Sequence, residues 1–184
     1  MEHWLHQRPR SIGLAAIALT VLKEHQMNNI DELLAIEQIK QLKARYCRTV
    51  DTKDWASCEA LFASDFVGES GASTGKPSGW DLKDLGLGVI GAGQMKGGAS
   101  WVERARKNIG ENISLHHAML PEIELISSTT ARAVWAVHFG VRGVKGAPFR
   151  TMDGHGHYYD TYELIAARWI IKSMKLVIQS IETT

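Results

Sequence analysis

The sequence has few cysteines, no excess of either charge and no long apolar run. Two cysteines, Cys47 and Cys58, stand among 184 residues. This number excludes a disulfide-dense secreted scaffold and predicts a cytoplasmic protein. Lysine and arginine total 21 against 20 for aspartate and glutamate, so charge gives no reason to expect nucleic acid or a membrane surface as a partner. A chain of this length predicts one core that needs no disulfide or metal.

The longest apolar run lies near the N-terminus, in IGLAAIALTVL at residues 12–22. It is about half as long as the roughly 20 residues that cross a bilayer. Two arginines precede it, as in an export signal, but KEHQ follows where a small-residue cleavage site belongs. Residues 1–26 are therefore predicted to be an N-terminal extension that is helical or dispensable, and residues 27–184 a single domain.

After Asp31 the apolar residues recur at three- and four-residue steps, which predicts a helix of about five turns. Its buried stripe is predicted to consist of Ile36, Ile39, Leu42, Tyr46 and Val50. Its basic residues are predicted to lie mostly off that stripe, namely Lys40, Lys43 and Arg45. A short second helix follows, and Asp51 or Thr52 can cap it. The buried side of this second helix is predicted to be Trp55, Cys58, Leu61 and Phe62.

The C-terminal part of the chain changes to a period of two. A third helix is predicted over Ala99–Lys107, and apolar residues then occupy alternate positions from Ala131 to Val141. That alternation predicts a half-buried strand. Gly154–Leu164 and Arg168–Ile178 are predicted as two more strands, joined by a turn at Ala166-Ala167. Helices followed by a strand meander predict an α+β fold, with an antiparallel sheet curling around the opening helices.

One glycine-rich run, GVIGAGQMKGGA at residues 88–99, is similar to the phosphate-binding turn of a nicotinamide-dependent dehydrogenase. In that fingerprint a strand delivers three glycines to a helix N-terminus, which holds the pyrophosphate. With Gly91 and Gly93 as the first two glycines, the third position falls on Lys96, and no convincing strand precedes the run. The segment Gly68–Gly98 is therefore predicted to be a long loop that binds no dinucleotide.

Several ionisable residues are candidates for chemistry. Asp51 lies between the first two helices, where it faces a cavity or caps the second helix. Tyr46 is predicted to be buried, either as a core residue or beside a cavity, and its hydroxyl needs a partner. His116 and His117 begin a strand, so they point to opposite faces and only one of them can face the core. Counting back from Ile123 in steps of two leads to His117, although Pro121 can interrupt that phase.

A histidine beside an inward carboxylate is a workable general base, while a lone histidine is more often structural. A second pair, His155 and His157, lies on one face of a predicted strand at a spacing that suits metal ligands. No sequence feature brings this pair to His116 and His117, and no carboxylate ligand is clearly placed. No metal is therefore predicted.

Three stretches of the chain resemble one known family. They are AIEQIKQLKARYCRTVDTKDWASCEALFASDFV (Ala35–Val67), LHHAMLPEIELISSTTARAVWAV (Leu115–Val137) and GHGHYYDTYELIAARWIIKSMKL (Gly154–Leu176). They resemble the SnoaL-like branch of the nuclear transport factor 2-like superfamily, nearest to the scytalone dehydratase and bile-acid 7-alpha-dehydratase group. The resemblance implies a cone-shaped, curved antiparallel or mixed sheet wrapped around N-terminal helices. It also implies cofactor-free chemistry, in which a His–Asp pair removes a proton next to a carbonyl and tyrosines polarise the substrate.

Carried over by position, the resemblance assigns a site. Tyr46 and Asp51 match the family's Tyr-X4-Asp pattern, and the base falls on His116 in preference to His117. The residues predicted to contact substrate are His117, Trp135, Tyr158 and Asp160. The departures from the family concern the leaving group, because Val50 replaces a second tyrosine and Phe139 replaces an acid. His138 lies near the position of a second pocket histidine but out of register with it.

The resemblance therefore implies a cofactor-independent lyase or isomerase of the dehydratase type, acting on a small hydrophobic, cyclic or aromatic substrate. Dehydration, isomerisation, cyclisation and C–C cleavage all remain open, because they use the same base. A homodimer or homotrimer is expected, with no nucleic acid or membrane partner. The alternative is a non-catalytic, small-molecule-binding or scaffold subunit of the same fold, such as the small subunit of a ring-hydroxylating dioxygenase.

Overall fold

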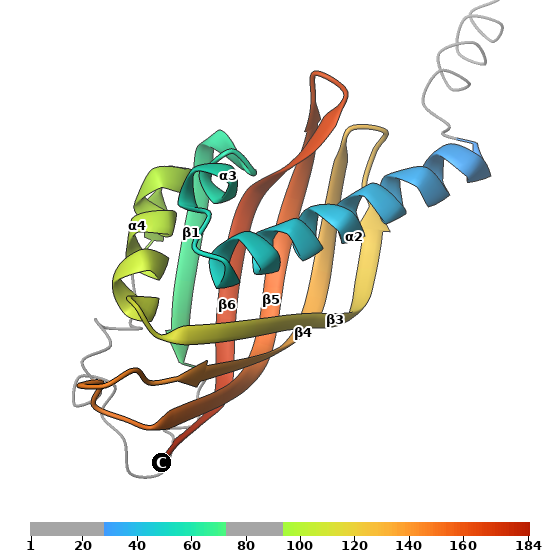
Figure 1. Cartoon of the computed structure of the whole chain (residues 1–184). Coiled ribbons are helices and arrows are strands. Elements are labelled where there is room, and N and C mark those ends of the chain that lie inside the picture. Colours follow the sequence, from blue (N-terminus) through green and yellow to red (C-terminus); the bar gives the residue numbers. More distant parts are fainter. Residues whose placement is uncertain (1–27, 73–93) are drawn as a thin grey trace, which may run out of the picture.

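The computed structural model of the protein describes residues 28–72 and 94–184 (Figure 1). The predicted extension at residues 1–26 and the first half of the glycine-rich run, residues 88–93, lie outside the described residues. Within these described ranges, three helices and six strands follow one another in the order α2 (Asn29–Asp51), α3 (Trp55–Glu59), β1 (Phe62–Ala72), β2 (Gln94–Lys96), α4 (Gly98–Ile109), β3 (Ile113–Leu125), β4 (Thr130–Arg142), β5 (Thr151–Ile165) and β6 (Arg168–Thr183).

The six strands form one curved sheet in the order β2-β1-β6-β5-β4-β3. β1 and β6 run parallel, and all other neighbours are antiparallel. Among the described strands the sheet does not close, because β2 and β3 are its two edges. Figure 1 shows α2 crossing one face of the sheet and α4 lying beside β1. The predicted α+β fold, a curved mixed sheet around N-terminal helices, is confirmed. Within residues 28–72 and 94–184 no helix has the length and apolar composition needed to cross a membrane.

Helix α2 begins at a polar cap and buries the predicted stripe. The Asn28 side chain accepts hydrogen bonds from the backbone N–H groups of Ile30 and Asp31, at 2.9 and 3.0 Å, which satisfies donors that have no partner within the helix. The buried residues of the stripe are Ile39, Leu42, Tyr46 and Val50. One prediction for this helix is wrong, because Lys43 is also buried, with 0 % of its surface exposed. Its ammonium group forms an ion pair with the carboxylate of Asp160 on strand β5.

The second helix is shorter than predicted. It ends at Glu59, and its cap is Asp54, whose carboxylate accepts from the Ser57 N–H at 3.2 Å. Phe62, predicted to lie on this helix, instead begins strand β1. The predicted loop is also wrong at both of its ends, since β1 continues to Ala72 and β2 occupies Gln94–Lys96. The parallel pairing of β1 with β6, a strand far along the chain, has no local sequence pattern that would reveal it.

The predicted C-terminal strands are confirmed as β4, β5 and β6. The turn between β5 and β6 lies at Ala166 and Ala167, whose φ angles of 48° and 60° suit a two-residue hairpin. Strand β3 contains a bulge between Met119 and Glu122. The bulge reverses which residues face the core, because one extra residue shifts the alternation of side chains. Counting from Ile123 therefore fails, and His116 instead of His117 lies on the inner face.

Candidate functional site

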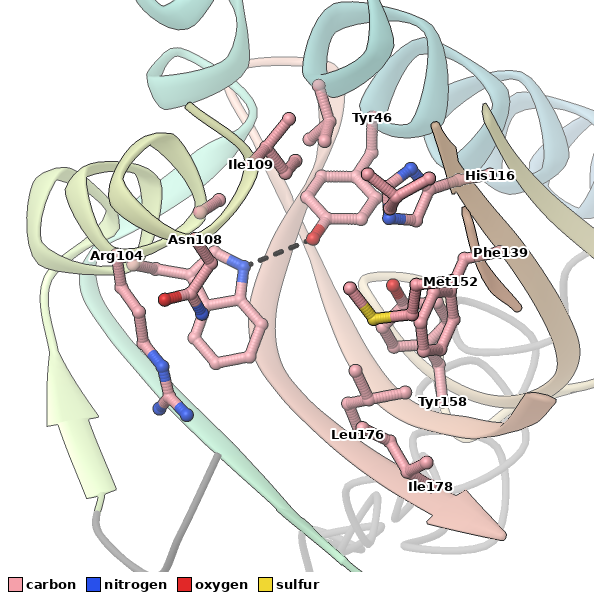
Figure 2. A pocket seen from close by; sticks show the side chains of 14 residues that line it. Tyr46, Arg104, Asn108, Ile109, His116, Phe139, Met152, Tyr158, Leu176 and Ile178 are labelled. Atoms are coloured by element: carbon pink, nitrogen blue, oxygen red, sulfur yellow. Dashed lines mark hydrogen bonds between the residues drawn. The ribbon is translucent and has the colours of Figure 1, made fainter. Parts of the chain in front are cut away.

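A cavity of about 120 Å³ lies between helices α2 and α4 and the inner face of the sheet (Figure 2). Most of its wall is apolar, and its apolar side chains come from helices α2 and α4 as well as from strands β4, β5 and β6. The side chains that bring polar atoms to this wall are Tyr46, Trp101, Arg104, Asn108, His116 and Tyr158. An apolar pocket with a few convergent polar groups is the usual form of a small-molecule site.

Asp51, the last residue of α2, holds His116 on the edge strand β3. The Nδ1 atom of His116 lies 2.6 Å from Asp51 Oδ1, and the His116 backbone N–H donates to Asp51 Oδ2 at 2.8 Å. The Ser114 hydroxyl donates to Oδ1 at 3.0 Å. Because a carboxylate only accepts hydrogen bonds, this geometry assigns the ring proton to Nδ1. Nε2 is then the unprotonated nitrogen, which can accept a proton. Asp51 therefore serves the histidine and does not cap the next helix.

The surroundings of Asp51 favour its ionised form. Burial by itself would raise the pKa of Asp51, but hydrogen bonds from the ring and backbone of His116 and from Ser114 hold the pKa below its usual value. An ionised carboxylate at 2.6 Å stabilises the imidazolium that forms when His116 takes up a proton. The pair can therefore act as a general base.

The other side of the His116 ring contacts Phe139. The two rings stack with centroids 5.9 Å apart and an interplanar angle of 24°, and both line the cavity. Phe139 pairs across the sheet with Gly154. A Cβ atom on Gly154 would collide with the Phe139 ring, so glycine at this position lets the ring lie against the sheet.

Tyr46 reaches the cavity from α2 and is held from α4. The Trp101 indole N–H donates to the Tyr46 hydroxyl at 3.2 Å, shown by the dashed line in Figure 2. Burial raises the pKa of Tyr46 far above its usual value, so this hydroxyl is a neutral donor at physiological pH. Trp101 was not predicted as a site residue. The helix that carries it was predicted, but its orientation toward Tyr46 depends on tertiary packing.

The structure places the predicted site residues in three environments. Tyr46, Asp51 and His116 come together at the cavity, and Tyr158 lines its wall. Trp135 and Asp160 are buried behind the wall. There Asp160 Oδ2 accepts from Lys43 Nζ at 2.8 Å and from the Tyr162 hydroxyl at 2.7 Å, and the Trp135 N–H donates to Tyr162 at 2.9 Å. The third environment is the outer face of the sheet, where His117 lies.

His117 lies on the outer face of the sheet, because the bulge in β3 turns its neighbour inward. Its ring stacks on His138 with centroids 6.0 Å apart. His155 pairs with His138 on the next strand, and His157 shares the face of His155. His116 is thus separated from these histidines by the sheet. Among the described residues, no three His, Cys, Asp or Glu side chains are grouped so as to hold a metal ion.

Comparison with known proteins gives one family and many structural neighbours. The model of the SnoaL-like domain family matches residues 31–175. A type 2 hexachlorocyclohexane dehydrochlorinase, LinA, is 14% identical with a TM-score of 0.66 over 85% of this chain and 93% of its own. A scytalone dehydratase-like protein of Novosphingobium aromaticivorans is 17% identical, with a TM-score of 0.67 over 85% and 92%. A protein with a cystatin-like fold from Nostoc punctiforme is 15% identical, with a TM-score of 0.55 over 84% and 95%.

Proposed function

Because the chain belongs to the SnoaL-like domain family, we propose that it is a cofactor-independent lyase or isomerase of a small hydrophobic, cyclic or aromatic substrate. The observation that carries the proposal is the Asp51–His116 pair, whose 2.6 Å contact lies at the edge of an apolar cavity. The cavity volume of about 120 Å³ is close to the roughly 150 Å³ of an engineered cavity that binds benzene. A single ring fits such a space, and a longer substrate would extend toward its opening.

In the proposed reaction His116 is the general base. Its Nε2 takes a proton from a carbon next to the substrate's carbonyl, and the electron pair of that C–H bond moves toward the carbonyl oxygen. Asp51 stabilises the imidazolium, and Tyr46 donates a hydrogen bond to the oxygen as negative charge develops. A positioned general base of this kind contributes about 10²–10⁴-fold in rate.

The second half of the reaction decides between a lyase and an isomerase. Return of the proton from His116 to a different carbon gives isomerisation, while loss of a group from the next carbon gives elimination. Two structural neighbours are described as a dehydrochlorinase and a scytalone dehydratase-like protein, and both names denote elimination. We therefore place elimination first, with isomerisation, cyclisation and C–C cleavage as the other outcomes of an assay.

The test begins with a thermal-shift screen of cyclic ketones, including ketones with a hydroxyl or halide leaving group on the β-carbon. A ligand at 100 times its dissociation constant stabilises the folded state by about 2.7 kcal/mol. Compounds that bind are then incubated with enzyme, and the products are identified by NMR in D₂O, where exchange of the abstracted proton is also visible. His116→Ala should lower turnover by about 10²–10⁴-fold, and the matched control His117→Ala, on the outer face, should not.

Wild-type turnover that survives His116→Ala would contradict the proposal. Binding without turnover or proton exchange would favour the alternative, a small-molecule-binding or scaffold subunit of the same fold.

We further propose that the chain assembles as a homodimer or homotrimer through the outer face of the sheet. On the edge strand β3, Leu115, Met119 and Leu120 are 53, 44 and 84% exposed. Leu120 also has a φ of 46°, an unusual backbone conformation for leucine that presents its side chain outward. Exposed apolar side chains on an edge strand favour association. Sedimentation should show an oligomer for the wild type and a smaller species for Leu120→Glu, whereas a monomeric wild type would contradict this assembly.

A further inference from the structure

Helix α2 buries a charged residue that the proposed chemistry does not use. Lys43 is 0% exposed, and its ammonium group lies 2.8 Å from the carboxylate of Asp160 on β5, which is 2% exposed. Removing two charges from water costs several kcal/mol for each ion, and their attraction repays this only when the geometry and the remaining hydrogen bonds are favourable. The pair therefore requires an explanation.

The hydrogen bonding of the pair is incomplete. Asp160 Oδ2 accepts from both Lys43 and Tyr162, while Oδ1 has no hydrogen-bond partner in the described part of the chain. A buried carboxylate oxygen without a donor loses its hydration with no compensation. Apolar residues of similar volume would serve stability as well as this pair does. Stability is therefore a poor explanation for a lysine at this position.

The position of the ammonium group offers a better explanation. Lys43 Nζ lies 3.5 Å from the centroid of the Tyr158 ring and 5.1 Å from that of Tyr46. Both rings line the cavity, and they meet edge to face at 6.1 Å. Figure 2 shows the Tyr158 side chain reaching into the cavity with its hydroxyl oxygen toward Tyr46. One aromatic ring thus separates a buried cation from the substrate space.

We propose that Lys43 is a positioning residue, which holds a positive charge on the ring of Tyr158 and so strengthens the Tyr158 hydroxyl as a hydrogen-bond donor to a carbonyl oxygen of the ligand. This inference rests on the proposed function, because it concerns the same cavity. It narrows the substrate class to compounds whose carbonyl oxygen lies beside Tyr158 while the adjacent carbon faces His116. Asp160 acts through Lys43 by fixing its ammonium group.

The physical basis is electrostatic. A cation over an aromatic face is attracted by the ring's electrons, and it stabilises negative charge that develops on the attached oxygen. This effect is strong in a buried site, where the effective dielectric constant is low. Burial raises the pKa of Tyr158 well above its usual value, with Tyr46, Cys47 and Asp160 adding to the rise. The hydroxyl therefore keeps its proton. It is hydrogen-bonded with Tyr46 in this structure, and in the proposal it donates to the ligand's carbonyl oxygen instead.

Two isosteric ligands test the inference without knowledge of the natural substrate. Cyclohexanone carries a carbonyl oxygen, and methylenecyclohexane replaces that oxygen with a CH₂ group. Their affinities are measured by ligand-observed NMR, and the carbonyl stretch of ¹³C=O cyclohexanone by infrared difference spectroscopy. In the wild type we expect tighter binding of the ketone and a carbonyl stretch below its value in hexane.

Three variants of the full chain distinguish an effect of the Lys43 charge on ligand binding from an effect of the substitution on folding. Lys43→Met removes the cation, the double variant Lys43→Met/Asp160→Asn removes both charges, and Lys40→Met changes an exposed lysine of the same helix as a control. We expect Lys43→Met to weaken cyclohexanone binding by about fivefold, which is within the range of a buried cation–π contribution. The double variant should weaken it less, because it also removes the charge of Asp160, which opposes that of Lys43 at Tyr158. Both should also raise the carbonyl stretch and leave methylenecyclohexane binding within about twofold of the wild type. Lys40→Met should match the wild type.

Each outcome decides the question. If Lys43→Met does not fold, the double variant carries the test, because it leaves no unpaired buried charge. A carbonyl stretch and a ligand preference unchanged in the double variant would show that Lys43 is only structural, and a wild type that binds both ligands equally would also overturn the inference. The proposed function fails separately, when His116→Ala leaves turnover and proton exchange unchanged while the carbonyl stretch still depends on Lys43.

Discussion

The carboxylate of Asp51 holds His116 by both its backbone and its ring. One oxygen accepts from the His116 backbone N–H at 2.8 Å, and the other lies 2.6 Å from Nδ1. The two contacts fix both the strand and the ring orientation relative to the end of α2. The outer face of the sheet carries a second pair, in which His138 Nε2 lies 2.8 Å from Asp153. That pair is exposed to solvent and is separated from the cavity by the sheet, which makes it a natural control.

Asp51→Asn should disable the base while changing the shape of the site very little. The amide can present its NH₂ to Nδ1 of His116, which would move the ring proton to Nε2 and leave no free nitrogen at the cavity. We expect kcat to fall by about 10²–10⁴-fold with little change in KM. Asp153→Asn should keep wild-type kcat. Equal kcat values for the two variants would remove Asp51 from the mechanism.

Acid should destabilise the wild type more than Asp51→Asn. The pKa of Asp51 is lower in the folded state than its usual value, so the ionised form stabilises the fold. This contribution is complete above the unfolded-state pKa of about 4 and is lost as the pH falls through the lower folded-state pKa. Urea unfolding of both proteins between pH 7 and pH 3 should show the difference in their free energies of unfolding shrinking toward low pH. A constant difference would contradict the linkage.

The inward position of His116 could not be predicted from the alternation of residues in the sequence, whereas other features of the fold could. The stripe of α2 and the alternation of β4 were predictable, because burial of one face imposes a simple period on each. The face that each β3 residue occupies was not predictable, because the bulge between Met119 and Glu122 reverses the alternation. Pro121, which lies in this bulge, indicates that the alternation can break but not by how many residues. Similarity to a known family favoured His116, whereas the alternation alone left His116 and His117 open because Pro121 could interrupt it.

Lys43 and strand β1 were missed for a related reason. A lysine on a helix is usually exposed, and the carboxylate that accepts this one lies on β5, far along the chain. Strand β1 is rich in serine, glycine and acidic residues and is stabilised by β6, its parallel neighbour. The residues near Lys43 and near β1 in the sequence do not indicate these partners, so only the tertiary structure reveals them.

Removing the Trp101 N–H should leave the Tyr46 hydroxyl less firmly positioned, because it loses a hydrogen-bond donor. Trp101→Phe keeps an aromatic ring on α4 but removes the donor that lies 3.2 Å from the Tyr46 hydroxyl. We expect a loss of about 0.5–1.5 kcal/mol in the free energy of unfolding, the usual net value of one hydrogen bond, and a lower kcat. Urea unfolding and steady-state kinetics would measure both. Unchanged kcat in a less stable variant would show that Tyr46 does not need this donor for catalysis.

Removal of the Lys43 charge should be costly, and removal of both charges should not. Lys43→Met leaves Asp160 buried without its cation, and breaking such a pair typically costs about 3–5 kcal/mol. Lys43→Met/Asp160→Asn leaves no charge behind, so its free energy of unfolding should recover much of that loss. Urea unfolding of the two variants and of the wild type completes the comparison. A double variant as unstable as the single variant would mean that the pair itself stabilises the fold.

Alanine substitutions at two glycines on neighbouring strands test whether Phe139 sets the shape of the cavity. One substitution should move Phe139, and the other serves as its control. A Cβ atom at Gly154 would collide with the ring of Phe139, whereas a Cβ atom at Gly140 would meet nothing within 4 Å. Gly154→Ala should therefore push Phe139 toward the cavity and disturb its stacking on His116, while Gly140→Ala should not. We expect weaker binding of cyclohexanone and lower turnover only in Gly154→Ala, with the ring displacement visible in a crystal structure. If both variants bind cyclohexanone like the wild type, the position of Phe139 does not set the size of the site, and the limit must come from the α4 side of the cavity.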